Sequence, residues 1–142
     1  MKVRDVMTKN VLRIHPEEPV EVAARTLAQY NIGAMPVCGR DGSVCGMVTD
    51  RDLVIRCMAS GRSPKTTTVG EVMSRQVVTV EPEMDTHLAA SLMGRRQVRR
   101  LPVLDRGKLC GVVTLGDLAG REEGAMDAAE ALSEITGNLW AE

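Results

Sequence analysis

Residues 45–53 read Cys45-Gly46-Met47-Val48-Thr49-Asp50-Arg51-Asp52-Leu53. A second copy of the pattern reads Cys110-Gly111-Val112-Val113-Thr114-Leu115-Gly116-Asp117-Leu118. In both copies an apolar run follows a glycine and ends at a threonine, and an aspartate stands three residues later. The apolar run is typical of a buried strand, and the leucine after the aspartate suits the start of a helix. The pattern therefore predicts, twice, a strand that leads directly into a helix.

The threonine and aspartate of each copy have two candidate roles. Thr-x-x-Asp at a strand–helix junction matches a capping box, in which the two residues satisfy each other's backbone N–H groups. The N-terminus of a helix also carries unpaired N–H groups and a partial positive charge, which attract phosphate. Each junction is predicted to be a helix cap, an anion site, or both.

The duplication extends beyond this motif. Met7 aligns with Met73, Pro16 with Pro82 and Pro36 with Pro102, and the second copy is one residue shorter after its turn. Matches at helix, strand and turn positions in one order indicate an internal repeat. A single repeat of about 60 residues would bury only about 60% of its unfolded surface. We therefore expect the two repeats to pack on each other.

Each repeat is predicted to run strand–helix–strand–strand–helix, which gives an α+β fold. The predicted helices carry apolar residues at helical spacing, and glycine-containing turns separate the hairpin strands. The predicted strands are 11–14, 34–38, 44–48, 77–80, 100–104 and 108–113, and the predicted helices begin after Pro19, Thr49, Asp85 and Thr114. Residues 124–139 have apolar residues at roughly helical spacing and predict an extra amphipathic helix. The predicted domain bounds are 1–61, 62–122 and 123–142.

Composition excludes several classes of function. The formal net charge of −1 gives no reason to expect nucleic-acid binding, and Tyr30 and Trp140 are the only aromatic residues. No stretch approaches the roughly 20 apolar residues of a membrane span, so we expect a cytoplasmic protein without membrane contact. His15 and His87 lie far apart, so no metal site is expected. No nucleophile–base pair or phosphate-binding loop indicates an enzyme, and no catalytic residue is assigned.

The motifs resemble those of the CBS-domain family (named for cystathionine β-synthase), in the form of a stand-alone bacterial pair of the hypoxic-response type. The resemblance covers residues 3 to about 121. It rests on Gly-x-Val-Thr-x-x-Asp-Leu in both copies and on two further pairs of segments. These are Val6-Met7 with Val72-Met73, and Ile32-Gly33-Ala34-Met35-Pro36-Val37 with Val98-Arg99-Arg100-Leu101-Pro102-Val103.

The resemblance implies two repeats packed about a pseudo-twofold axis, with two clefts that bind adenosine-containing ligands, and a homodimer. It implies that the threonine contacts phosphate, that the aspartate contacts the ribose, and that the segment before the Pro-Val strand lines the adenine pocket. Carried onto this chain, the first site would use Gly33, Ala34, Met35, Pro36, Thr49 and Asp52. The second would use Arg99, Arg100, Leu101, Pro102, Thr114 and Asp117.

The two sites differ in charge. Arg99 and Arg100 occupy the positions of Gly33 and Ala34. Two guanidinium groups favour a polyphosphate, although their bulk can also obstruct a pocket. We therefore expect inequivalent sites.

The sequence thus predicts a non-catalytic sensor module. It would need no cofactor and would bind AMP, ADP, ATP or S-adenosylmethionine as a regulatory ligand. The alternative is a constitutive dimerisation or protein-interaction module with vestigial nucleotide sites, in which the tail helix is the docking surface.

Overall fold

The computed structural model describes residues 1–120 and 125–140. It divides into two compact units, which are described separately. The N-repeat unit comprises residues 12–77 and 107–109, and the C-repeat unit comprises residues 1–11, 78–106 and 110–142. Each unit therefore contains most of one repeat and the first residues of the other. We call these first residues, 1–11 and 69–77, the leading segments. The predicted bounds at 61 and 122 concern the repeats along the chain and stay a prediction.

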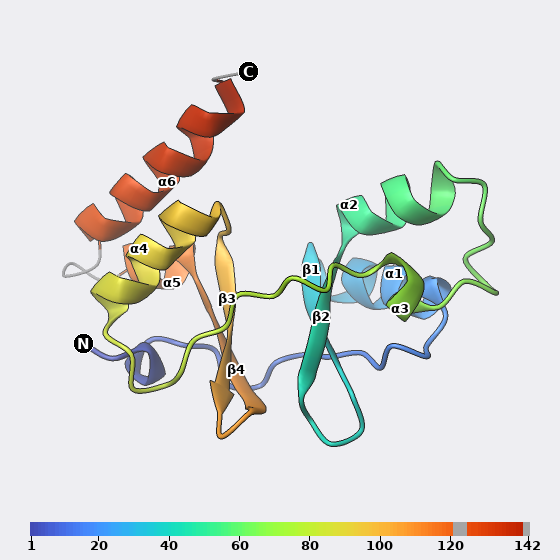
Figure 1. The fold of residues 1–142 in the computed structure, drawn as a ribbon, viewed down its shortest axis with the longest axis horizontal. Helices are drawn as coiled ribbons and strands as arrows, with labels where there is room; N and C mark the ends of the chain where they lie inside the picture. Colours follow the sequence, from blue (N-terminus) through green and yellow to red (C-terminus); the bar gives the residue numbers. More distant parts are fainter. Residues whose placement is uncertain (121–124, 141–142) are drawn as a thin grey trace. The chain divides into compact units, whose positions relative to one another are not determined.

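The N-repeat unit is built on one antiparallel hairpin (Figure 1). Ala34 lies opposite Thr49 in this hairpin, so the start of its first strand is beside the end of its second. The elements of the unit are α1 (Val20–Tyr30), β1 (Ala34–Cys38), β2 (Val44–Thr49), α2 (Asp50–Asp52), η2 (Leu53–Met58) and α3 (Val69–Val72). Its core packs the apolar face of α1, including Ala23 and Leu27, against buried strand residues such as Met35 and Val48. This is the amphipathic packing that the sequence predicts.

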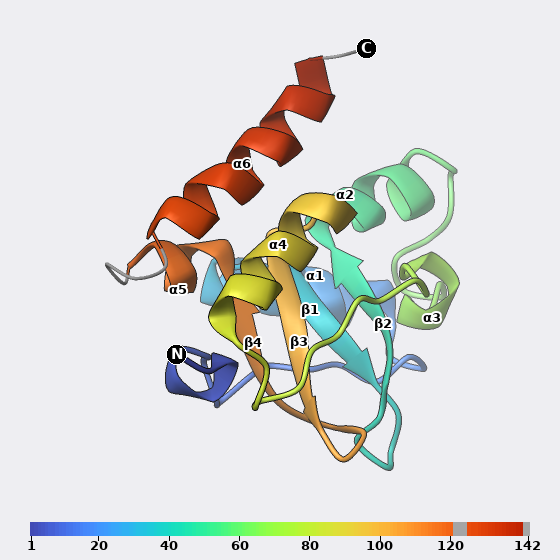
Figure 2. The ribbon, with the colours of Figure 1, turned by 60° about the vertical axis from the view of Figure 1, so that its left-hand side comes forward.

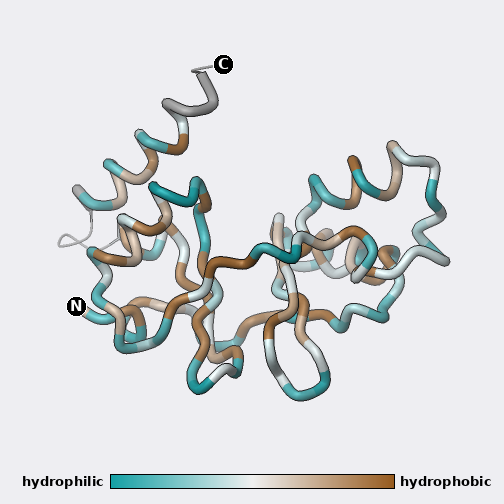
Figure 3. Tube along the Cα trace, viewed as in Figure 1, coloured by the Kyte–Doolittle hydropathy of each residue, from teal (hydrophilic) through white to brown (hydrophobic). Residues whose placement is uncertain are grey.

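The C-repeat unit repeats this plan and adds a helix. Its elements are η1 (Val3–Asp5), α4 (Thr86–Arg96), β3 (Arg100–Asp105), β4 (Lys108–Thr114), α5 (Leu115–Ala119) and α6 (Ala125–Trp140). The helix α6 lies beside α4 and α5, as Figures 1 and 2 show from two sides. Ala128, Ala131 and Ile135 are buried, with exposed fractions of 3%, 1% and 7%. Hydrophilic and hydrophobic residues alternate along α6 (Figure 3), so the predicted amphipathic tail helix is confirmed.

The first strand of each repeat is shorter than the sequence predicts. Only Ile14 and Val80 bridge, in parallel, to the neighbouring strand. Ile14 N–H donates to Pro36 O (3.1 Å) and Ile14 O accepts from Cys38 N–H (2.9 Å). In the same way Val80 N–H donates to Pro102 O (3.0 Å) and Val80 O accepts from Leu104 N–H (2.8 Å). The next ladder bond would need an N–H group at Pro36 or Pro102, and proline has none. A proline in the partner strand therefore limits each first strand to one residue.

Glycine is required in the repeated motif for a steric reason. Residues Met73 and Ser74 cross β2, where Met47 and Ser74 exchange two backbone hydrogen bonds of 2.8–2.9 Å. A Cβ on Gly46 would lie 2.6 Å from Met73 Sδ and 2.7 Å from Ser74 O. At Gly111, in the C-repeat unit, a Cβ would lie 2.7 Å from Met7 Sδ and 2.8 Å from Thr8 O. Each leading segment thus passes over a strand at a point where only glycine leaves room.

No helix among the described residues is long and apolar enough to cross a bilayer.

Candidate ligand site

Both Thr-x-x-Asp motifs form capping boxes. Asp117 N–H donates to Thr114 Oγ1 (3.0 Å), and Thr114 N–H donates to Asp117 Oδ2 (2.8 Å). Thr49 and Asp52 make the same two bonds, each 3.0 Å long. The capping role is therefore confirmed. The helix α5 that follows Thr114 is only five residues long, so its terminus offers little field for an anion, whereas α2 continues without a break into η2.

A pocket of about 510 Å³ lies at the second predicted site. It brings together Arg99, Arg100 and Thr114, three of the six residues assigned from the sequence. The rest of its wall consists of Leu115, Gly116 and Ala119 from α5 and Ala128, Ala129 and Leu132 from α6. The pocket is thus cationic at one side and mainly apolar at the other.

The other three residues of the second set lie around the pocket but do not line it. Leu101 is fully buried in the core of the C-repeat unit, and Pro102 is buried beside it. Side chains alternate along a strand, so Leu101, which follows Arg100 on β3, is directed to the core. Asp117 is held by the cap, with one carboxylate oxygen on Thr114 N–H. These residues support the pocket wall.

The two arginines supply the positive charge of the pocket. Among the described side chains, those of residues 1–120 and 127–136, none makes a hydrogen bond or ion pair to the guanidinium group of Arg99 or Arg100. The backbone is fixed, because Leu115 N–H donates to Arg99 O (2.8 Å). Arg99 is exposed and Arg100 is half-buried. Two positioned guanidinium groups without partners can bind a phosphate group through paired N–H donors.

The first predicted site is assembled differently. Asp50 N–H donates to Gly33 O (3.0 Å), which brings Gly33 and Ala34 beside Thr49. Met35 is fully buried and Pro36 is also buried, so both belong to the core. Asp52 Oδ1 lies 3.8 Å from Arg56 Nε. The acidic group of Asp50 lies near Gly33, 3.5 Å from where a Cβ would stand. This end of the hairpin carries a carboxylate where the other repeat carries guanidinium groups.

The sequence did not predict a groove between α1 and η2 in the N-repeat unit. The groove has a volume of about 700 Å³ and is lined by apolar residues of both helices, including Ala24, Ala28 and Met58. Ala24 and Ala28 are exposed, whereas the aligned residues Ala90 and Gly94 are buried in α4. The difference arises because α6 covers α4, whereas no helix of the described N-repeat unit occupies the corresponding place on α1. The only hint in the sequence is that the tail follows the second repeat alone.

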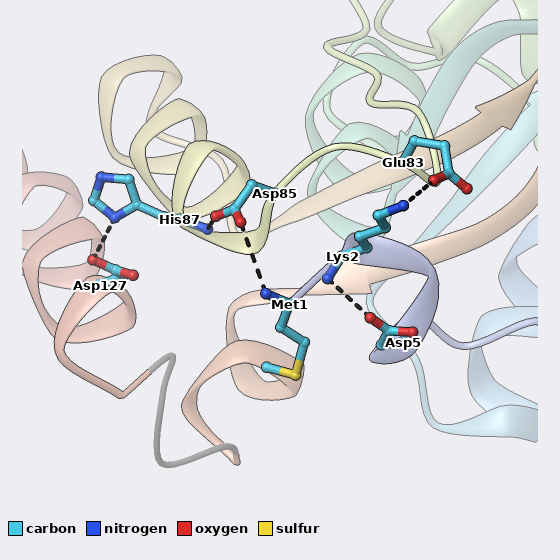
Figure 4. A network of polar contacts seen from close by, with 7 residues as sticks. All are labelled: Met1, Lys2, Asp5, Glu83, Asp85, His87 and Asp127. Atoms are coloured by element: carbon cyan, nitrogen blue, oxygen red, sulfur yellow. Dashed lines mark hydrogen bonds and ion pairs between the residues drawn. The ribbon is translucent and has the colours of Figure 1, made fainter.

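A polar network joins α6 to its unit (Figure 4). His87 Nδ1 lies 2.9 Å from Asp127 Oδ1, and His87 N–H donates to Asp85 Oδ1 (2.8 Å). The hydrogen bond and charge of Asp127 raise the pKa of His87, and Asp85 and Glu130 add to the effect. The Met1 amino group lies 3.8 Å from Asp85 Oδ2. Protonation of His87 therefore strengthens the contact between α4 and α6.

The four cysteines are free thiols. Cys45 Sγ donates to Val37 O (3.3 Å), and Cys110 Sγ donates to Val103 O (3.4 Å). Burial raises the pKa of Cys38 and of Cys110. Cys38 and Cys57 are buried, as expected for small apolar residues. Among the described residues, no group of three or more His, Cys, Asp or Glu side chains is arranged to hold a metal ion.

Comparisons with known proteins agree with this duplicated architecture. The family described as "CBS domain" matches residues 3–58 and 69–124. The chain is 41% identical over 134 residues to the CBS domain-containing protein YhcV of Bacillus subtilis, covering 94% of each chain.

A second relative and two solved structures give the same result. Hypoxic response protein 1 of Mycobacterium tuberculosis is 37% identical over 116 residues, which is 82% of this chain and 81% of that protein. The crystal structure named for Hypoxic Response Protein I, with two coordinated zinc ions, superposes with a TM-score of 0.79 at 36% identity, covering 85% and 98% of the two chains. A CBS domain pair in complex with 5′-methylthioadenosine and S-adenosyl-L-methionine superposes with a TM-score of 0.74 at 25% identity, covering 84% and 94%.

Proposed function

The chain belongs to the CBS-domain family, and on that premise we propose that it is a non-catalytic regulatory module that binds an adenine nucleotide in the C-repeat pocket. The nucleotide acts as a regulatory ligand, and the fold needs no resident cofactor. The observation that carries this proposal is the pair of guanidinium groups of Arg99 and Arg100 in a pocket with Thr114, where no described side chain pairs with either arginine. One solved relative contains adenosine-type ligands, which supports the choice of nucleoside.

Charge distinguishes among the adenosine ligands. The phosphates of AMP, ADP and ATP are anionic, and the guanidinium groups of Arg99 and Arg100 can hold them through paired N–H donors. S-adenosylmethionine carries a sulfonium, an ammonium and one carboxylate group, and its net positive charge is repelled by these cations. We therefore expect nucleotides to bind more tightly than S-adenosylmethionine, and polyphosphates more tightly than adenosine.

The test is isothermal titration calorimetry of the full chain with ATP, ADP, AMP, adenosine and S-adenosylmethionine. Arg99→Ala and Arg100→Ala should each weaken nucleotide binding about tenfold or more, since a charge-assisted hydrogen bond contributes about 1.5–3 kcal/mol. Arg95→Ala is the matched control, because Arg95 is exposed on α4 and does not line the pocket. The proposal fails if no member of the panel binds, or if the Arg95 variant loses as much affinity as the other two.

A second candidate function, protein interaction, is favoured by the open groove of the N-repeat unit. We infer that a second copy of this chain covers it, giving a homodimer. Val54, Ile55 and Met58 of η2 are 52%, 47% and 73% exposed, next to the exposed Ala24 and Ala28. A contiguous apolar surface of this kind marks an interaction site. The apolar face of α6 is already buried in its own unit, so the groove is the better docking surface.

Light scattering coupled to gel filtration tests this inference. We expect a mass about twice 15.4 kDa for the wild type and 15.4 kDa for Met58→Glu. Leu88→Glu is the control, because Leu88 is 54% exposed on α4, away from the groove. A monomeric wild type, or a Met58→Glu variant that stays dimeric, would reject the groove as a homodimer interface.

A further inference from the structure

The helix α6 forms a wall of the C-repeat pocket. Ala128, Ala129 and Leu132 of α6 face the same cavity as Arg99, Arg100 and Thr114. Leu132 is 40% exposed and Ala129 is exposed, so a ligand in the pocket would cover apolar surface on this helix. The tail helix is thus a part of the candidate site, although its sequence lies outside both repeats.

The helix α6 packs closely along α4 and α5, and within residues 127–136 it does so through small side chains and one exposed polar contact. The buried side chains of its central turns are two alanines and one isoleucine, Ala128, Ala131 and Ile135. The helices approach closely at Gly94, where a Cβ would lie 2.9 Å from Glu134 Oε2. The polar contact between His87 and Asp127 is largely exposed at the histidine, whose side chain is 68% accessible. Each of these small side chains buries little apolar area, and the exposed polar pair contributes little, so each contact in residues 127–136 is individually weak.

We propose that nucleotide binding and α6 docking are coupled, so that occupancy of the C-repeat pocket is reported by α6. This inference rests on the proposed function. A ligand that contacts Leu132 and Ala129 binds the docked form better than a form with α6 detached. By linkage, the ligand raises the docked population, and detachment of α6 lowers ligand affinity by the same factor.

The N-repeat unit supplies an internal comparison. There the surface equivalent to that beneath α6 is open, and Ala24 and Ala28 are exposed where Ala90 and Gly94 are buried. No helix among the described residues walls the first predicted site in this way. The coupled site is therefore specific to the second repeat, and only at that site can bound ligand change the docking of α6.

The experiment combines two measurements on the full chain. Hydrogen exchange of the α6 peptides is measured with and without saturating ATP, and ATP affinity is measured for three variants. Ala131→Glu places a charge at a position that is 1% exposed between α6 and its neighbours, and so detaches α6. Ser133→Glu adds the same charge at an exposed position on α6 that does not line the pocket. Leu132→Ala shortens the wall without removing a buried contact.

We expect ATP to slow exchange in α6, and Ala131→Glu to weaken ATP binding about fivefold or more, within the usual range of coupling between sites. Ser133→Glu should bind as the wild type does, and Leu132→Ala should lose affinity while the exchange of ligand-free α6 is unchanged. If ATP binds with unchanged α6 exchange and Ala131→Glu binds equally well, the coupling is refuted and the proposed function stands. If the wild type binds no nucleotide, the proposed function fails and this inference fails with it.

Discussion

Substitution of Gly111 by alanine tests why the motif glycine is repeated. Gly111 lies in β4 where residues 7 and 8 cross the strand. The new Cβ would lie 2.7 Å from Met7 Sδ and 2.8 Å from Thr8 O. The thioether can turn aside, but Thr8 O is a backbone atom held by the two bonds between Thr8 and Val112, of 2.9 and 3.0 Å. The leading segment must therefore accept the overlap or move away.

Both routes cost a similar amount. Overpacking of this kind typically costs about 1–3 kcal/mol. Moving residues 7 and 8 away removes two backbone hydrogen bonds, each of which contributes about 0.5–1.5 kcal/mol. Relief of the overlap requires loss of the bonds, so the two terms are alternatives and do not add, and we expect a loss of about 1–3 kcal/mol. For a chain of this size that lowers the melting temperature by roughly 3–12 °C.

The assay is thermal unfolding followed by circular dichroism, with Gly116→Ala as the control. At Gly116, in α5, a Cβ would meet only Thr114 Oγ1, at 3.6 Å, which is ordinary contact. Alanine there should leave stability unchanged or raise it slightly, because alanine favours helix. Gly46→Ala should match Gly111→Ala, since its contacts are 2.6 and 2.7 Å. A Gly111→Ala variant within about 1.5 °C of the wild type would refute the steric argument.

Three further predictions concern the caps, the α6 contact and the thiols. Thr114→Ala should cost about 1 kcal/mol in chemical denaturation and Thr114→Ser much less; equal losses would show that the hydroxyl cap is not the cause. Asp127 raises the pKa of His87, so the charged pair is present below that pKa and is lost as the pH rises through it. Asp127→Asn should therefore lower the pKa of His87 in an NMR titration and remove this pH dependence of α6 exchange; an unchanged pKa contradicts the contact. Burial raises the pKa of Cys38, so thiol labelling of Cys38 near pH 8 should be slower in the folded than in the unfolded chain, and equal rates would contradict its burial.

Local patterns predicted the helices, the hairpins and the caps. The apolar spacing of α1 and the Thr-x-x-Asp motif of α5 act over one or two turns, so a sequence alone carries them. Arg99, Arg100 and Thr114 were also assigned to one site, and they do meet in one pocket. The antiparallel hairpin explains this, because the beginning of its first strand returns beside the end of its second.

The remaining features depend on partners distant in sequence. The sequence shows that Gly46 and Gly111 occupy equivalent positions. The steric reason for them can be seen only once the positions of the leading segments are known. Leu101 was assigned to the pocket although the strand turns it to the core. The wall formed by α6 could not be predicted, because amphipathic spacing shows that a helix needs a surface and not which surface it covers.

Because each leading segment packs in the unit of the other repeat, the chain cannot be cut between the repeats into two self-sufficient fragments. Residues 1–11 are counted with the C-repeat unit, and residues 69–76 with the N-repeat unit. A fragment cut between the repeats would lack the strand-crossing piece that its own hairpin requires, and would carry the piece required by the other. Two such fragments, produced separately and mixed, supply each other's missing part, so the chain is suited to a split reporter that regains its fold only on reassociation.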